Sequence, residues 1–506
     1  MNRRDFLVQA ACAGGAPALA AGLQNSASSL RAGYAEADIS PDIGMEQPGG
    51  YGKVFHKTFH DPCKARAAVF ENAGTRIALV SVDALVIPRP VVVEAREKIR
   101  ERCGIAPEAV MIAATHSHSS GPTGMVLPGE FDHADPFVRK LAYEMSSCAD
   151  KRYLDRVRDG IVEAVSTACQ PLVPARCGFG FGIEDKVAYN RRFRMKNGLS
   201  YTHPGKGNPD IVGPAGPVDP QVGVIGTWNA EGRLIGCIVN FACHGTTNPG
   251  GISANWIYYL EQAIRGVLGK DVIVLFLAGP CGDVTQVDNL SPYANPSGDQ
   301  WARYVGGRVG TEAVKVLHAA TPGSDVPLSA QSKLLRIPRR KPSPAHVQRA
   351  MELAKKTREE VGATEWTFAK ETVLLDAILA KSPEVDAEVQ VLQVGPVALP
   401  SAPAEYFCEF GLQWKKRSAF PLTFPVELAN GIVGYVPTAE ALGKNGGGYE
   451  TRLTAYTNLV PSAGDQMLEA GVEMMAHMTP GKVPVPELAP PFREPWSYGN
   501  VPPELE

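Results

Sequence analysis

The chain has 506 residues, a net charge of −3, 44% hydrophobic residues and 20% charged residues. This composition is typical of a globular protein, and it lacks the basic excess of nucleic-acid-binding proteins, so we expect no nucleic-acid partner. The length predicts one large α/β domain with additions, or several lobes.

The first residues have the pattern of an export signal. The pair Arg3-Arg4 precedes two apolar residues, and a weakly apolar run rich in Ala and Gly extends to Ala21. This pattern predicts a twin-arginine signal peptide over residues 1–21 and a periplasmic or secreted location. The alternative is a chance arginine pair before an N-terminal helix. No later stretch reaches the roughly 18 apolar residues that a membrane span needs.

After a flexible lead over residues 22–32, strand and helix patterns alternate along the chain. In chain order the predicted elements are strands at 65–70 and 77–84, a helix at 91–102, a strand at 110–114, one or two helices within 137–170, a strand hairpin at 221–228 and 233–243, a helix at 254–267, a strand at 272–277, helices at 301–318 and 345–361, and strands at 389–394 and 397–399. The alternation predicts the α/β class.

The cysteines do not form a recognisable framework. Nine remain after Cys12, which lies in the predicted signal, and they are scattered without a C-x-x-C pair. An odd number argues against a complete set of disulfides. A single disulfide stays open, and the sequence does not identify the pair.

Three of the ten histidines lie where a predicted strand ends. His116 and His118 follow the strand at 110–114, and His244 closes the strand at 233–243. Alternate residues of an extended segment point the same way, so His116 and His118 can face one pocket. A catalytic zinc site needs about three protein ligands, and imidazole is a common one. The three residues favour a metal site over histidines that merely bond to the backbone.

Weaker candidates lie in nearby loops. Asp283 follows a predicted strand, where its carboxylate could orient a ligand histidine or cap a helix. Arg191 could clamp a carbonyl oxygen or carry ordinary surface charge. His56, His60 and His133 are candidate pocket residues. The sequence has no H-E-x-x-H and no G-x-S-x-G motif.

Several motifs resemble, in the same order, those of the neutral/alkaline non-lysosomal ceramidases. Residues 115–122, T-H-S-H-S-S-G-P, resemble the T-H-T-H-S-G-P of that family, and residues 241–246, F-A-C-H-G-T, resemble its F-A-V-H-G-T. Asn190-Arg191 is similar to the start of its N-R-S segment, and residues 282–284 resemble its G-D-V.

The resemblance continues more thinly toward the C-terminus. Glu405 lies in a segment similar to the family's P-G-E, Tyr435 in one similar to its G-Y-V, and Tyr449 in one similar to its Y-E-G. Glu409, four residues after Glu405, is a rival for the same role. The family's glutamate and its G-Y-V tyrosine are metal ligands, so the resemblance extends the histidine pair to a full ligand set.

The resemblance implies a ceramidase-like catalytic domain of mixed β-sheets flanked by helices, which hydrolyses a carbon–nitrogen (amide) bond with metal-activated water. The implied zinc (Zn2+) ligands are His116, His244, Glu405 and Tyr435. The residues implied around the substrate carbonyl are His118, Arg191 and Tyr449. The implied substrate is a small-molecule or lipid amide, as in sphingolipid metabolism, and a lipid would bring peripheral contact with a membrane. The sequence specifies no oligomeric state.

Three departures from the family pattern keep other functions open. Residues 278–281, A-G-P-C, lack the family's serine, and Asn255 stands where the family has Asp. The family's C-terminal immunoglobulin-like domain is not expected, so we predict a catalytic domain over 33–480 and a Pro-rich tail over 481–506. A zinc esterase or lactonase, or a non-catalytic binding protein with a degenerate site, are the alternatives.

Overall fold

The computed structural model describes residues 30–491 and 501–506. The predicted signal peptide and residues 22–29 of the predicted lead lie outside this range. The end of that lead is predicted wrongly, because strand β1 (Arg31–Asp38) already begins before residue 33. Its sequence, R-A-G-Y-A-E-A-D, is poor in β-branched residues, so propensity gives little sign of a strand. It pairs with β2 along its whole length.

An eight-stranded mixed sheet forms the N-terminal half, in the order β12-β11-β10-β5-β1-β2-β3-β4. Its other strands are β2 (Lys64–Asn72), β3 (Thr75–Val82), β4 (Val110–Ala114), β5 (Val173–Ile183), β10 (Gln221–Asn229), β11 (Leu234–Phe241) and β12 (Ile273–Ala278). The predicted hairpin of β10 and β11 is confirmed, whereas β3–β4 and β11–β12 pair in parallel. The sheet coils so that β3 approaches β12, although the two strands are far apart in the strand order. Ser81 Oγ on β3 donates to the Phe276 carbonyl on β12 at 2.7 Å.

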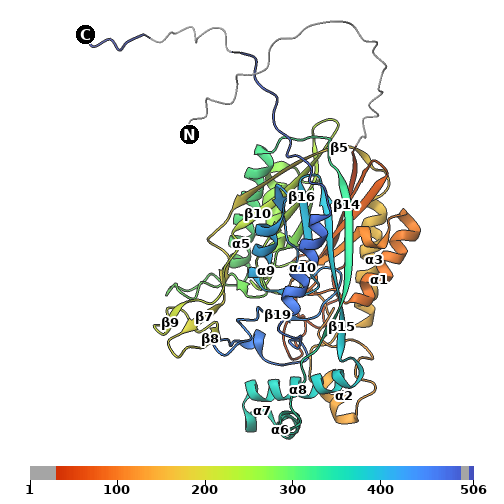
Figure 1. The fold of residues 1–506 in the computed structure, drawn as a ribbon, viewed down its shortest axis with the longest axis vertical. Coiled ribbons are helices and arrows are strands. Elements are labelled where there is room, and N and C mark those ends of the chain that lie inside the picture. The colour runs from red at the N-terminus through yellow and green to blue at the C-terminus, as the bar shows by residue number, and fades with distance from the viewer. Residues whose placement is uncertain (1–29, 492–500) are drawn as a thin grey trace.

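Two pairs of helices pack against this sheet, at different strands. Helix α1 (Arg89–Cys103) packs against α3 (Lys151–Ala168), and α4 (Trp256–Leu268) packs against α5 (Gly298–Ala319). Helix α3 packs against β1 and β2, and α5 packs against β5 and β10, so the two helices lie apart in Figure 1. The predicted α/β class is therefore confirmed, and the described sheets do not close into a barrel.

A second, four-stranded sheet supports the C-terminal half. Its order is β14-β15-β16-β18, with bounds Leu328–Pro338, Glu384–Val394, Val397–Ser401 and Leu422–Thr423. Helices α9 (Cys408–Arg417) and α10 (Ala463–Ala476) pack against each other beside it. Strand β14 contacts β2 and β3, and one buried apolar core includes residues of both sheets. The two halves therefore share a core.

A group of helices gathers at one end of the molecule (Figure 1). It comprises α2 (Pro136–Tyr143), α6 (Pro344–Ala354), α7 (Arg358–Val361) and α8 (Ala363–Lys381). The single helix predicted over 345–361 is wrong, because Thr357 forms a capping box that starts a new helix. Trp366 is buried in the apolar core of this group.

Short elements complete the fold around the ends of the main strands. They are η1 (Pro107–Ala109), β6 (Tyr189–Asn190), β7 (Arg192–Met195), β8 (Ser200–Thr202), β9 (Ile211–Pro214), β13 (Val284–Thr285), β17 (Glu405–Tyr406), β19 (Tyr435–Val436) and η2 (Tyr449–Thr451). Strands β17 and β19 are parallel neighbours, and β6 pairs with β13. Residues 481–491 contain no helix or strand.

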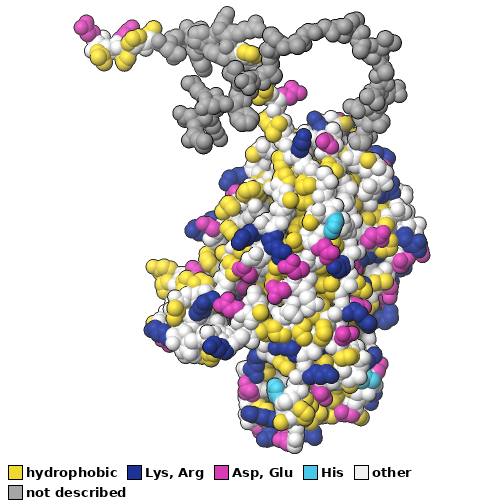
Figure 2. Space-filling view, in the orientation of Figure 1, with side chains coloured by type: hydrophobic (Ala, Val, Ile, Leu, Met, Phe, Trp, Pro, Cys, Tyr) yellow, Lys and Arg dark blue, Asp and Glu magenta, His cyan; other side chains and the backbone are white. Residues whose placement is uncertain are grey.

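The face seen in Figure 2 shows no segregation of charge. Figure 2 shows acidic and basic side chains interspersed over the visible face. In the described part of the chain, no helix combines the length and the apolar character needed to cross a membrane.

Candidate metal centre

His116 and His118 follow β4 directly, and their rings meet. The ring centroids are 4.8 Å apart and the two Nε2 atoms 3.3 Å apart. The predicted reason, alternation along an extended segment, is wrong, because His116 has a φ of 62° in the left-handed region. Hydrogen bonds from the N–H groups of Thr115 and Ser117 to backbone carbonyls fix this turn. Such strained backbone is concentrated at functional sites.

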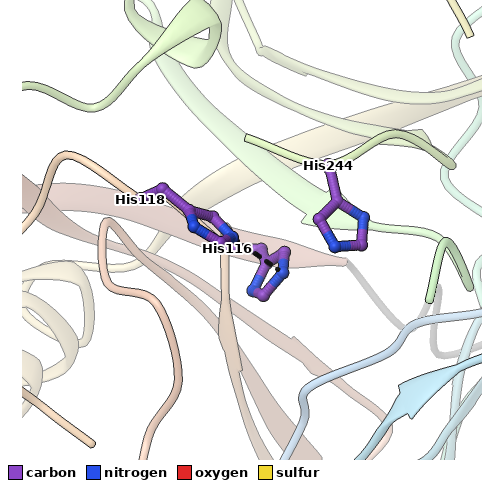
Figure 3. A group of neighbouring side chains, drawn as sticks. All are labelled: His116, His118 and His244. Atoms are coloured by element: carbon purple, nitrogen blue, oxygen red, sulfur yellow. Dashed lines mark hydrogen bonds between the residues drawn. The ribbon is translucent and has the colours of Figure 1, made fainter. Parts of the chain in front are cut away.

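His244 follows β11 and completes the group (Figure 3). Its ring centroid is 4.5 Å from that of His116, and one ring nitrogen of each of the three histidines lies within 4.8 Å of the others. The Nδ1 atoms of His116 and His244 each lie 3.0 Å from a backbone carbonyl oxygen, those of Leu85 and Val284. A carbonyl accepts but does not donate, so Nδ1 carries the proton and Nε2 presents a lone pair to the centre.

Glu405 brings a carboxylate to the same point from the C-terminal half. Its Oε2 lies 3.3 Å from Nε2 of His116 and 3.3 Å from Nε2 of His244. This buried oxygen has no hydrogen bond of good geometry to any described residue, whereas Oε1 accepts one from the Tyr456 hydroxyl at 2.7 Å. Lone pairs of two imidazoles and one carboxylate therefore converge in a buried space.

The protonation states of the group depend on one another. Burial alone would lower the pKa of His116, but the Glu405 carboxylate outweighs burial and raises it. Burial alone would raise the pKa of Glu405, but the two histidines hold it well below its usual value. The pKa of His244 falls to about 3 through burial and the Arg191 charge. His244 is thus neutral at pH 7, and this donor set fits a divalent cation.

Arg191 and two tyrosines surround this point. The Tyr435 hydroxyl accepts a hydrogen bond from Arg191 Nη2 at 3.0 Å and lies 3.2 Å from the Tyr449 hydroxyl. Arg191 is buried and is held by the Glu450 carboxylate at 2.7 Å. Its Nη1 also lies 3.2 Å from His244 Nε2, a contact that metal binding by His244 would replace. The predicted alternative for Arg191, surface charge, is therefore wrong.

The structure brings all the predicted ligand and carbonyl-binding residues into one cluster: His116, His118, Arg191, His244, Glu405, Tyr435 and Tyr449. Glu409, the rival of Glu405, lies in the first turn of α9 and pairs with Gln413 at 2.7 Å instead. It belongs to the helix surface rather than to the cluster.

The remaining candidates have structural partners. Asp283 does not orient a histidine, since its carboxylate accepts hydrogen bonds from the Cys408 N–H that starts α9 and from the Asn190 amide. The other three candidate histidines also lie outside the cluster, with partners of their own: His56 bonds the Ser120 carbonyl, His60 bonds Asp61 and Asp299, and His133 bonds the Ala377 carbonyl.

Three residues at the site were missed in the sequence. Tyr456 orients Glu405, and Glu450 holds Arg191. Tyr51 lies beside them in a small cavity and belongs to a loop before any predicted strand. Glu450 adjoins Tyr449 in a segment that resembles the family, so a signal existed for it; Tyr51 and Tyr456 lie in stretches without a motif.

The cavity at the cluster is small and rich in phenol groups. It has a volume of about 60 Å³ and is lined by Gly49, Gly50, Tyr51, Leu85, His118, Met125, Glu405, Tyr435, Tyr449 and Tyr456. A further cavity of about 40 Å³ shares Tyr51, Met125 and Tyr456 with it. Apolar side chains such as Phe131 and Leu374 line the second cavity beside the carboxylate of Glu371.

Fold and site together define a mixed α/β protein with a buried histidine–carboxylate cluster that could bind a metal ion. No family model matches the chain. Its sequence is 28% identical to neutral ceramidase of Pseudomonas aeruginosa over 284 residues, which are 53% of this chain and 38% of that protein. The match therefore spans less than half of the relative's length.

Solved structures extend the likeness over most of the chain. The crystal structure of neutral ceramidase from Pseudomonas aeruginosa matches with a TM-score of 0.63 at 22% identity, covering 90% of this chain and 77% of that one. A ceramidase complexed with C2 matches with a TM-score of 0.64 at 21% identity, covering 92% and 77%. The sequence match shows homology to neutral ceramidase, and the structures show that the fold is shared.

Proposed function

We propose that this chain is an exported, zinc-dependent hydrolase of amide bonds. The observation that carries the proposal is the convergence of His116 Nε2 and His244 Nε2 on Glu405 Oε2 in a buried space. Two neutral imidazoles and a carboxylate are a common donor set of catalytic zinc. Homology to a ceramidase, which cleaves an amide, directs the proposal to a carbon–nitrogen bond.

We assign the zinc ion to His116, His244, Glu405 and Tyr435. Tyr435 pairs in register with Glu405 across the parallel strands β17 and β19, and both residues line the same cavity. A zinc ion in such a site polarises a carbonyl oxygen and lowers the pKa of water to near neutrality.

Arg191 and Tyr449 are positioned for the oxygen of the scissile carbonyl. The guanidinium is fixed by Glu450 and by the Gly282 carbonyl, at 2.7 Å each, so it is oriented before substrate arrives. Preorganised donors of this kind stabilise the negative charge that develops on a carbonyl oxygen under attack. The Tyr449 hydroxyl lies on the cavity side of the cluster and supplies a second donor.

His118 is suited to proton transfer. Burial, together with the charges of His116 and His244, holds its pKa well below the usual value, so the ring is neutral at pH 7. A neutral imidazole that lines the cavity can take a proton from water and deliver it to the leaving amine. Its Nε2 also lies within reach of the metal group, so its role as base rather than ligand is part of the proposal.

The two neighbouring cavities suggest the kind of substrate. Together they offer room for a short buried group, with both apolar and carboxylate walls. The loop that contributes Gly49 and Tyr51 also exposes Val54 and Phe55, at 55% and 51%. Apolar side chains beside the site support an N-acylated lipid presented at a membrane surface, and a small soluble amide is the alternative.

The test is amine release from purified protein with N-acylated substrates, from N-acyl sphingosine to short N-acyl amines and amino acids. We expect release that a chelator abolishes and zinc restores, with the best substrate defining the buried group. Matched acyl esters and lactones are assayed in parallel, because activated water attacks either carbonyl. Release that is unaffected by the chelator would refute zinc dependence.

Absence of turnover on any member of the panel, with zinc bound, would instead favour a binding protein. Two residues that depart from the family pattern are relevant to this alternative. Cys281, in the stretch that lacks the family's serine, is buried and bonds the Glu427 carboxylate at 2.8 Å. Asn255 caps α4 and also bonds Thr247. Both side chains therefore make structural contacts.

Export is tested separately, by cell fractionation of the chain with Arg3 and Arg4 both changed to Lys. We expect the unchanged chain outside the cytoplasm and the variant inside it. Equal distribution of the two chains would refute twin-arginine export.

A further inference from the structure

Two cysteines meet at the edge of the fold away from the metal centre. Cys103 ends α1, and Cys169 caps the end of α3. Each is 6% exposed, and the two thiols are close enough for each to shift the pKa of the other. Cys103 Sγ also lies 3.9 Å from the hydroxyl of Ser166, which precedes Cys169 on α3. Two helices distant in sequence thus present paired thiols.

A guanidinium lies beside the pair. Arg76, at the start of β3, donates from Nη1 to the Cys103 carbonyl at 2.7 Å, and the same nitrogen lies 3.7 Å from Cys169 Sγ. A neighbouring positive charge favours the thiolate, which is the reactive form in disulfide exchange. The pKa of Cys103 falls to about 6, chiefly through the hydrogen bond from the Cys169 thiol, with Ser166 and Arg76 adding to the effect.

We propose that Cys103 and Cys169 form a disulfide bond that ties the end of α1 to the end of α3. The oxidant is a disulfide of a thiol–disulfide oxidoreductase or of glutathione. The Cys103 thiolate attacks one sulfur of that disulfide and releases a thiol; Cys169, on losing its proton, then attacks Cys103 Sγ and releases the second thiol. The two cysteines lose two electrons and two protons, and the oxidant's disulfide becomes two thiols.

The disulfide would restrict the segment that carries the histidine motif. The loop it closes contains β4, His116 and His118. A disulfide reduces the conformational freedom of the unfolded chain, and the effect grows with the length of the closed loop. Oxidation is therefore expected to stabilise the protein without touching the metal centre. The proposal does not depend on amide hydrolysis, and its test needs no substrate.

The experiment is a peptide map of the full chain without reduction, after treatment with oxidised glutathione and alkylation of free thiols in denaturant. We expect one linked pair of peptides, containing Cys103 and Cys169, that disappears after dithiothreitol. Alkylation of both cysteines after oxidant treatment would overturn the proposal, and so would a crosslink of either one to another cysteine.

Variants and thermal unfolding give a second measurement. Cys103→Ser and Cys169→Ser should each lose the crosslink, whereas Cys148→Ser, whose thiol contacts backbone carbonyls elsewhere, should keep it. The oxidised chain should unfold about 4 °C above the reduced chain. Cys103→Ser should show no such difference, and an equal difference in that variant would overturn the proposal.

Discussion

The two halves of the molecule deliver their side chains to the candidate metal centre in different ways. His116 and His244 follow β4 and β11 of the eight-stranded sheet, and each is fixed through Nδ1 by a backbone carbonyl. Glu405 and Tyr435 lie on two-residue strands, β17 and β19, and Glu405 is oriented by the Tyr456 hydroxyl. The first arrangement is held by backbone and the second largely by side chains.

The difference predicts how substitutions in each half should affect the metal centre. A ligand that the backbone fixes keeps its tautomer and direction without help from its neighbours. A carboxylate that a side chain orients depends on that partner, so substitutions in the C-terminal half should change geometry before they abolish binding. The experiments below concern the half that carries the histidines, and their expected effects range from complete loss of metal to small changes in rate.

The largest effect is expected for His244→Ala. Removal of one of the two backbone-fixed imidazoles should abolish tight zinc binding and lower kcat/KM by about 10⁴-fold or more, because metal and activated water are lost together. Elemental analysis of the purified variant gives the metal content. His318→Ala, on an exposed face of α5, is the control and should keep both. Full zinc occupancy in His244→Ala would exclude His244 as a ligand.

His118→Ala separates a proton-transfer role from a ligand role. If His118 moves protons, the variant should keep its zinc and lose about 10²- to 10⁴-fold in kcat. The measurement pairs elemental analysis with kinetics on the best substrate from the amide panel. Loss of zinc to the extent seen in His244→Ala would instead make His118 a third imidazole ligand, as its position in the three-histidine group allows.

The same contrast explains what the sequence could predict. Strand ends rich in β-branched residues, followed by histidine, gave the positions of His116 and His244 because local pattern and function coincide there. The contact of Glu405 with them joins residues far apart in sequence and was predicted only through the resemblance. Tyr456 had no motif, because its role arises from a loop that folds back onto β17.

The secondary structure also divides into elements that the sequence predicted and elements that it missed. The parallel strand β4 was predicted from its continuous apolar run, and the β10–β11 hairpin from the turn residues 229–232 between two strand patterns. Strand β1 was missed because alanine and glycine carry little strand propensity. Helix α8 was also missed, and it is apolar on several faces because it is buried within the group of helices at the end of the molecule. Tertiary burial overrides local pattern in both cases.

The pH dependence of stability tests the buried ion pairs around Glu261. Burial alone would raise the pKa of Glu261, but Arg66 and Lys64 outweigh it and lower the pKa from 4.5 to about 2. A carboxylate with a lowered pKa stabilises the fold above pH 4.5 and loses that contribution as the pH falls toward 2. The contribution is on the order of 3 kcal/mol.

Glu261→Gln should therefore be less stable at pH 7 and should lose less stability than the unchanged chain between pH 5 and pH 2. Urea unfolding at a series of pH values measures both. Glu469→Gln, which removes one partner of an exposed ion pair with Arg417, is the control and should follow the unchanged chain. Parallel curves for Glu261→Gln and the unchanged chain would exclude this ion-pair network as the source of acid sensitivity.

The smallest effect is expected where a loop touches the cluster. Gly49 has a φ of 105°, and a Cβ there would lie 2.1 Å from His118 Nδ1. Gly44→Ala is a matched control, because Gly44 has a φ of 94° with no atom within 4 Å of the added carbon. Both variants share a backbone cost of about 1 kcal/mol.

Only Gly49→Ala should displace the His118 ring, so it should lower kcat by about tenfold or more while zinc content stays unchanged. The ratio of kcat between the two variants removes the shared backbone cost, and thermal unfolding checks that this cost is equal. Equal kcat values would mean that the loop yields to the added methyl group and that the position of His118 depends on the backbone after β4 alone. A tenfold ratio would mean that the loop that closes the cavity also positions the proton-transfer residue.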